Sequence, residues 1–149
     1  MRIVVGAAVR RAARILAAHR LSLQLEPDLP LLQLDEVLFE QALFNLLDNA
    51  AKYAPAGSTV SVSAFRNDGK VVLRISDEGE GIPPGSLEHV FEKFYRAGGA
   101  DRRRPGTGLG LAICRGFIEA MRGSVAAANR TDRSGAVFTI ELPVPEKTP

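Results

Sequence analysis

This chain of 149 residues has a single cysteine, no long apolar run and almost no net charge. The lone Cys114 rules out a disulfide framework and fits a reducing compartment. No apolar run reaches the roughly 20 residues that a membrane-spanning helix needs, and the N-terminal residues show no secretory pattern. We therefore expect a soluble chain, and its length fits one domain with its own core.

The net charge is +2, and the basic residues include three consecutive arginines, Arg102 to Arg104. Nucleic-acid binding is not expected, because no array of aromatic residues for base stacking surrounds this block and the charges of the whole chain nearly balance. A loop that faces phosphate or solvent fits the arginines better.

The spacing of apolar residues predicts three helices and several strands. Residues 4–19 repeat apolar side chains at helical intervals, and residues 21–26 alternate leucines with polar residues as a half-buried strand does. Asp35 is placed to cap a long helix that Pro55 ends, and a further helix follows Gly110. The other predicted strands cover residues 60–64, 71–75, 125–127 and 138–142.

Helices placed between antiparallel strand pairs predict an α+β fold, a two-layer α/β sandwich. Its sheet is mixed but mostly antiparallel, and about three helices cover one face. Asp68-Gly69 supplies the turn of the first hairpin. We assign residues 1–143 to this domain and residues 144–149 to a C-terminal tail.

Two blocks of polar residues come first among the candidate functional segments. Asn45 and Asn49 share one face of the long helix with Lys52, and an asparagine oxygen beside a triphosphate suits Mg²⁺; a merely solvated helix face is the alternative. Residues 77–82, Asp-Glu-Gly-Glu-Gly-Ile, form an acidic turn after a predicted strand. This turn lacks the spacing and closing glutamate of an EF-hand calcium loop, so a nucleotide contact or a plain surface turn remains.

Two further blocks follow. Residues 91–96, Phe-Glu-Lys-Phe-Tyr-Arg, place Phe91, Phe94 and Tyr95 on one face of a short predicted helix, unless they pack in the core. Residues 106–111, Gly-Thr-Gly-Leu-Gly-Leu, open a helix, and a glycine-rich helix N-terminus binds anions. This last block has neither the ending of a P-loop nor the glycine spacing of a dinucleotide-binding fold.

In this order, the four blocks resemble the N, G1, F and G2 boxes of the catalytic, ATP-binding domain of sensor histidine kinases. Residues 40–44, 112–116 and 132–136 are similar to the potassium-responsive KdpD sensor kinases in particular. The resemblance covers nearly the whole chain. It implies the same fold, ATP and Mg²⁺ as ligands, and transfer of the γ-phosphoryl group to a histidine.

The resemblance also implies roles for individual residues. Asn49 becomes the Mg²⁺ ligand, with Asn45 as its support and Lys52 at the phosphates. Asp77 accepts a hydrogen bond from the adenine amino group. The loop from about residue 96 to 108 becomes a lid over ATP. The other implied nucleotide-binding residues are Tyr53, Gly79, Gly81, Ile82, Phe91, Gly106, Thr107, Gly108, Leu109, Gly110 and Leu111.

The histidine that receives phosphate in this family lies in a motif that this chain lacks, because His19 and His89 stand in other sequence contexts. The resemblance therefore implies a separate phosphoacceptor domain as partner, a response regulator indirectly, and a homodimeric full-length kinase, membrane-bound with this domain in the cytoplasm. Ala136 stands where relatives often carry Ser or Thr, so no hydroxyl contact is implied there. The alternatives are a non-catalytic nucleotide-binding module and a gyrase-type ATPase, which needs a glutamate at the position of Asn45.

Overall fold

The computed structural model describes residues 2–30, 32, 34–93 and 109–145. In chain order, its elements are α1 (Arg2–Arg11), β1 (Arg20–Leu25), α2 (Glu36–Tyr53), β2 (Thr59–Asn67), β3 (Lys70–Ser76), the short 3₁₀ helix η1 (Pro84–Ser86), α3 (Gly110–Ala120), β4 (Ser124–Asn129) and β5 (Ala136–Pro143).

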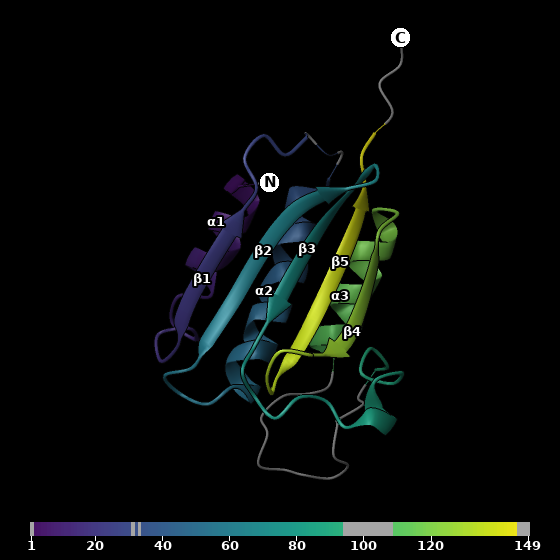
Figure 1. The fold of residues 1–149 in the computed structure, drawn as a ribbon. Coiled ribbons are helices and arrows are strands. Elements are labelled where there is room, and N and C mark those ends of the chain that lie inside the picture. The colour runs from purple at the N-terminus through teal and green to yellow at the C-terminus, as the bar shows by residue number, and fades with distance from the viewer. Residues whose placement is uncertain (1, 31, 33, 94–108, 146–149) are drawn as a thin grey trace.

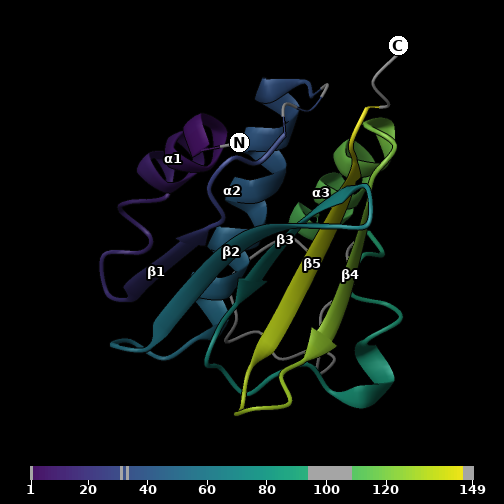
Figure 2. The same ribbon diagram turned by 45° about the horizontal axis from the view of Figure 1, so that its top comes forward.

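The five strands form one sheet in the order β1-β2-β3-β5-β4. β1 runs parallel to β2, and the other three neighbouring pairs are antiparallel. Figure 1 shows α1, α2 and α3 together on one face of this sheet, and the turned view in Figure 2 separates the two layers. The predicted α+β sandwich, with a mixed and mostly antiparallel sheet, is confirmed.

α2 is the central helix of the core, and its ends follow the predicted signals. Asp35 Oδ1 accepts hydrogen bonds from the backbone N–H groups of Val37 and Leu38, each at 3.1 Å, which caps the helix. The helix stops at Tyr53, two residues before Pro55, whose ring nitrogen has no hydrogen to donate. The largest fully buried side chains of the domain include Phe39, Leu43, Leu46, Leu47, Leu73, Ile75, Ile118, Ile140 and Leu142.

Two local predictions need correction. The regular part of the first helix ends at Arg11 instead of residue 19, because the N–H of Ala13 bonds to the carbonyl of Arg10 only three residues back, and turns follow. β1 is an edge strand, so Leu21 and Leu23 stay 36% and 46% exposed instead of half-buried. The Asp68-Gly69 hairpin between β2 and β3 forms as predicted.

One end of the sandwich gathers three elements that carry the candidate residues (lower end in Figure 1). β3 ends where β5 begins, with Ser76 paired to Val137, so the chain leaves the sheet there as Asp77. The C-terminus of α2 and the N-terminus of α3 lie at this same end. Among the described residues, no helix is both long and apolar enough to cross a membrane.

Candidate functional site

Asp77 is the buried centre of this end of the molecule. Only 3% of the residue is exposed, and its Oδ1 accepts hydrogen bonds from the N–H groups of Gly79, at 2.9 Å, and Ala136, at 3.2 Å. Its own carbonyl accepts a bond from Arg130 Nη1 at 3.1 Å. The two bonds to Oδ1 offset the cost of removing the carboxylate from water and fix its orientation, while the bond from Arg130 holds the backbone. The departure at Ala136 removes a hydroxyl, but the backbone N–H there still reaches Asp77.

The acidic turn (residues 77–82) is held from outside by the β4–β5 loop (residues 130–135) and by the last residue of β4. Ser134 Oγ donates a hydrogen bond to the carbonyl of Gly79 at 2.7 Å. The side-chain amide of Asn129 accepts a bond from the N–H of Ile82 at 2.6 Å and donates one to the carbonyl of Ile82 at 2.7 Å. The turn is therefore clamped in its first half, at Gly79, and at its last residue, Ile82.

Two ion pairs strengthen this clamp. Glu78 accepts a bond from the N–H of Thr59 at 2.6 Å and pairs with Arg133 at 3.0 Å, and both contacts hold the pKa of Glu78 below its usual value. The two bonds from Arg130 lower the pKa of Asp132 to about 2. In the sequence, the signal for these loop residues is the KdpD-like stretch at 132–136, and no role was predicted for Arg130, Asp132 or Arg133.

α2 presents the residues of the first block on one face. Asn45 bridges two elements, because its Oδ1 accepts a bond from Gln41 at 2.8 Å and its Nδ2 donates to the carbonyl of Gly110 at 3.0 Å. Asn49, one turn further along, is half-buried. Lys52 pairs with Asp48 at 2.8 Å. Among the described residues, no group of three or more His, Cys, Asp or Glu side chains is placed to hold a metal ion.

The last turn of α2 touches the acidic turn directly. Gly79 lies so close to this helix that an added Cβ would come within 2.5 Å of the carbonyl oxygen of Tyr53. Any other residue would push the turn away from α2. The first two blocks of the sequence, 45–53 and 77–82, are thus brought into contact as the site prediction requires.

The N-terminus of α3 faces the same region. Leu109 occupies the N-cap position and offers no side-chain hydrogen bond to the first turn, so Gly110 and Leu111 open the helix without a side-chain cap. Among the described residues, an added Cβ at Gly110 would meet nothing within 4 Å. Gly106, Thr107 and Gly108 lie outside the described residues.

Phe91 packs on the sheet. Its ring meets Phe138 edge to face, with centroids 6.0 Å apart and an angle of 86° between the planes, and Arg115 approaches its ring at 6.0 Å. The chain forms η1 at Pro84–Ser86 and then runs in turns to Lys93. The described part of the predicted short helix, residues 91–93, is therefore not helical. Core packing, the alternative reading of this block, describes Phe91. Phe94, Tyr95 and the expected lid at 96–108 lie outside the described residues.

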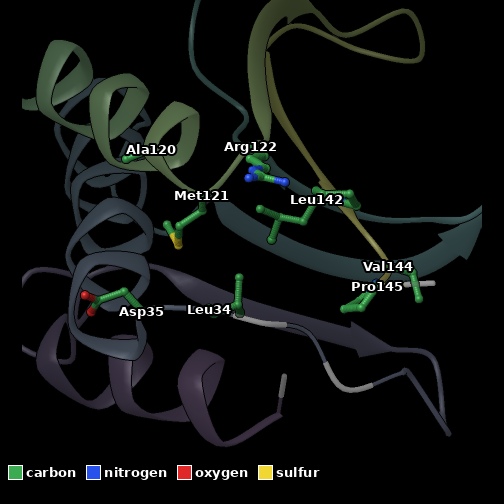
Figure 3. Close-up of a pocket in the computed structure, with 9 residues that line it drawn as sticks. Leu34, Asp35, Ala120, Met121, Arg122, Leu142, Val144 and Pro145 are labelled. Atoms are coloured by element: carbon green, nitrogen blue, oxygen red, sulfur yellow. The ribbon is translucent and has the colours of Figure 1, made fainter. Parts of the chain in front are cut away.

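A cavity of about 720 Å³ lies at the opposite end of the sandwich. It is bounded by the segment before α2, the C-terminal end of α3 and the end of β5 (Figure 3). Leu34, Met121 and Leu142 give it apolar walls, and Arg122 is its basic residue. No described residue of the four sequence blocks lines it, so it is not the site that the sequence predicts.

Residues 34–146 match the family model described as histidine kinase-, DNA gyrase B- and HSP90-like ATPase. This chain belongs to that ATPase family. Sensor protein KdpD of Clostridium acetobutylicum is 38% identical over 94% of this chain, which spans 16% of that relative's length. Alginate biosynthesis sensor protein KinB of Pseudomonas aeruginosa is 38% identical over 85% of this chain and 21% of its own length.

Solved structures agree with this assignment. The mycobacterial sensor histidine kinase MprB aligns with a TM-score of 0.87 and 32% identity over 98% of this chain and 97% of its own. Full-length ShkA in complex with AMPPNP aligns with a TM-score of 0.77 and 30% identity over 99% of this chain and 30% of its own. The predicted family, the ATPase domain of sensor histidine kinases, is therefore confirmed.

Proposed function

We propose that this ATPase domain binds ATP and Mg²⁺ and transfers the γ-phosphoryl group to a histidine on a separate phosphoacceptor domain. A ring nitrogen of that histidine bonds to the γ-phosphorus, the bond from this phosphorus to the bridging oxygen breaks, and ADP leaves. Positioning and charge neutralisation do most of the catalysis in such a transfer. Residues 1–143 form the catalytic domain in this proposal, and residues 144–149 form the tail.

The observation that carries the proposal is the buried Asp77 carboxylate. Both of its backbone hydrogen bonds use Oδ1, so Oδ2 is left to accept a bond from the amino group of adenine. Guanine would present a carbonyl oxygen at this point, and two buried acceptors facing each other would both stay unpaired. The carboxylate therefore favours ATP over GTP.

The phosphates fit the start of α3. A helix N-terminus presents backbone N–H groups and the positive end of the helix dipole to an anion, and Leu109 at the N-cap of α3 has no side chain that could compete as a cap. Lys52 can turn to a phosphate at little cost, because its pair with Asp48 is about one third exposed and such pairs stabilise by less than about 1 kcal/mol.

The residues present also fit a magnesium ion. Asn49 offers a neutral oxygen one helical turn from Asn45, whose side chain reaches the start of α3, and Mg²⁺ takes few protein ligands when phosphates and waters supply the rest. When bound, the ion neutralises charge on the triphosphate. Asn45 helps to position Asn49 next to the phosphate site, because its hydrogen bond to the carbonyl of Gly110 links α2 to the beginning of α3.

The gyrase-type alternative is disfavoured by the same residue. Hydrolysis of ATP needs a base that accepts a proton from water, and Asn45 is a neutral amide already bonded to Gln41 and Gly110. We therefore expect slow hydrolysis by the isolated domain.

The role in the whole protein follows from the KdpD relatives. We propose a KdpD-like sensor kinase for potassium or osmotic signals, homodimeric and membrane-bound, with this domain in the cytoplasm and a response regulator downstream. The assignment is supported by the 38% identity to the Clostridium acetobutylicum protein, which extends over 94% of this chain, whereas the same identity to KinB extends over 85%.

The test uses γ-labelled ATP, Mg²⁺ and the phosphoacceptor domain of the same kinase, expressed separately. We expect acid-labile phosphate on the acceptor domain, no label on this chain, and loss of transfer in Asn49→Ala. Strong label on His19 or His89, or rapid release of free phosphate with no transfer, would contradict the proposal.

A further inference from the structure

The side-chain amide of Asn129 makes two hydrogen bonds to the backbone of Ile82, in the pattern that a neighbouring strand would make with its own backbone. One amide group accepts from the N–H and donates to the carbonyl of the same residue, at 2.6 and 2.7 Å. Neighbouring strands normally exchange these two bonds between backbones. Ile82 belongs to no strand, so the Asn129 amide takes the place of a strand partner at the end of β4.

The acidic turn presses against this amide. Gly81 has a φ of 85°, and an added Cβ there would come within 2.7 Å of Asn129 Oδ1. A side chain at Gly81 would therefore be strained by its backbone and would also displace the amide. The position of the turn's second half is set by Asn129, while Asp77 and Ser134 hold Gly79 in its first half.

We propose that Asn129 is a positioning residue for nucleotide recognition. It holds the Ile82 backbone at a fixed distance from the Asp77 carboxylate. The adenine ring binds between these two parts of the turn. This inference rests on the proposed function, since it assumes that Asp77 accepts the adenine amino group. Without the amide, the second half of the turn loses its fixed place and adenine loses its fit.

Removal of the Asn129 amide should weaken ATP binding more than it lowers the stability of the fold. Asn129 lies at the end of an edge strand and is half-buried, and its two bonds reach the backbone of Ile82, whose side chain is only partly buried and packs at the edge of the hydrophobic core. Removal of two neutral hydrogen bonds corresponds to a roughly 5- to 150-fold change in an equilibrium constant. We expect most of this change in the dissociation constant for ATP.

The test compares Asn129→Ala and Asn129→Asp with the parent chain. Asn129→Asp keeps the size of the side chain and one acceptor, but its second oxygen faces the carbonyl of Ile82, which is also an acceptor. Asn67→Ala is the matched control, because Asn67 is exposed at the far end of β2. Calorimetry with ATP·Mg²⁺ and GTP·Mg²⁺ gives the affinities, and amide hydrogen exchange at Ile82 reports the clamp directly.

We expect both Asn129 variants to bind ATP at least about fivefold more weakly and to prefer adenine less, with faster exchange at Ile82 and an unchanged urea midpoint. The control should match the parent. If Asn129→Asp binds like the parent, only the shape of the side chain matters and the inference is wrong. A parent chain that fails to bind ATP would instead overturn the proposed function, and this inference with it.

Discussion

Replacement of Asp77 by asparagine separates nucleotide recognition from folding. The native carboxylate uses Oδ1 to accept from the N–H groups of Gly79 and Ala136. In Asp77→Asn, the amide oxygen must take the position of Oδ1, because an NH₂ group there would face the N–H donors of Gly79 and Ala136. The NH₂ group then takes the position of Oδ2 and faces the amino group of adenine.

The expected magnitude follows from this swap. A hydrogen bond to a charged group contributes about 1.5–3 kcal/mol, so ATP should bind roughly 10- to 150-fold more weakly. The advantage of ATP over GTP should shrink as well, because a guanine carbonyl can accept from the new NH₂ group. The two backbone bonds survive, so the free energy of unfolding should change little. In Asp77→Ala these two buried N–H groups lose their partner, at about 1–3 kcal/mol each.

Calorimetric titration with ATP·Mg²⁺ and GTP·Mg²⁺, together with urea unfolding, measures both effects. Asp68→Asn makes the same chemical change in the β2–β3 turn at the other end of the sheet, where asparagine suits the positive φ of 46°. This control should behave like the parent. If Asp77→Asn binds ATP with the parent's affinity and preference, Asp77 does not read the adenine ring.

Three further outcomes test the fold and its electrostatics. Leu46→Ala should lower the free energy of unfolding by about 2–5 kcal/mol in urea, because Leu46 is fully buried, and a change below about 1 kcal/mol would refute its place in the core. Burial raises the pKa of Cys114 to about 12, so iodoacetamide should label the native chain slowly at pH 8 and the unfolded chain quickly; equal rates would be the contrary result. The pKa of Glu78 is lowered from 4.5, so its stabilisation is complete above that pH and is lost as the pH falls below it. Urea midpoints of Glu78→Gln should therefore fall less steeply with acid than those of the parent, and parallel curves would count against the ion pair.

Elements with local signals could be predicted from the sequence. The α2 helix carries its own cap at Asp35, its own stop before Pro55 and a repeating apolar face, so each signal lies within a few residues of its effect. The Asp68-Gly69 turn likewise determines its own conformation, with positive φ at both residues. These interactions do not depend on the rest of the chain.

Elements that depend on distant neighbours could not be predicted in the same way. The exposure of Leu21 and Leu23 follows from the edge position of β1, which no pattern within the strand encodes. The candidate site shows the same limit. Its blocks were recognisable as motifs, but the partners that hold them lie far away: Asn129 is 47 residues from Ile82.

We propose that nucleotide binds between the acidic turn, the end of α2 and the start of α3. The most direct test of this claim is an amide NMR titration of the chain with a non-hydrolysable ATP analogue and Mg²⁺. We expect large shifts for the amides of Gly79, Gly81 and Gly110, and none for Met121 and Arg122 at the opposite cavity. Shifts confined to that cavity, or no shifts at saturating analogue, would contradict it.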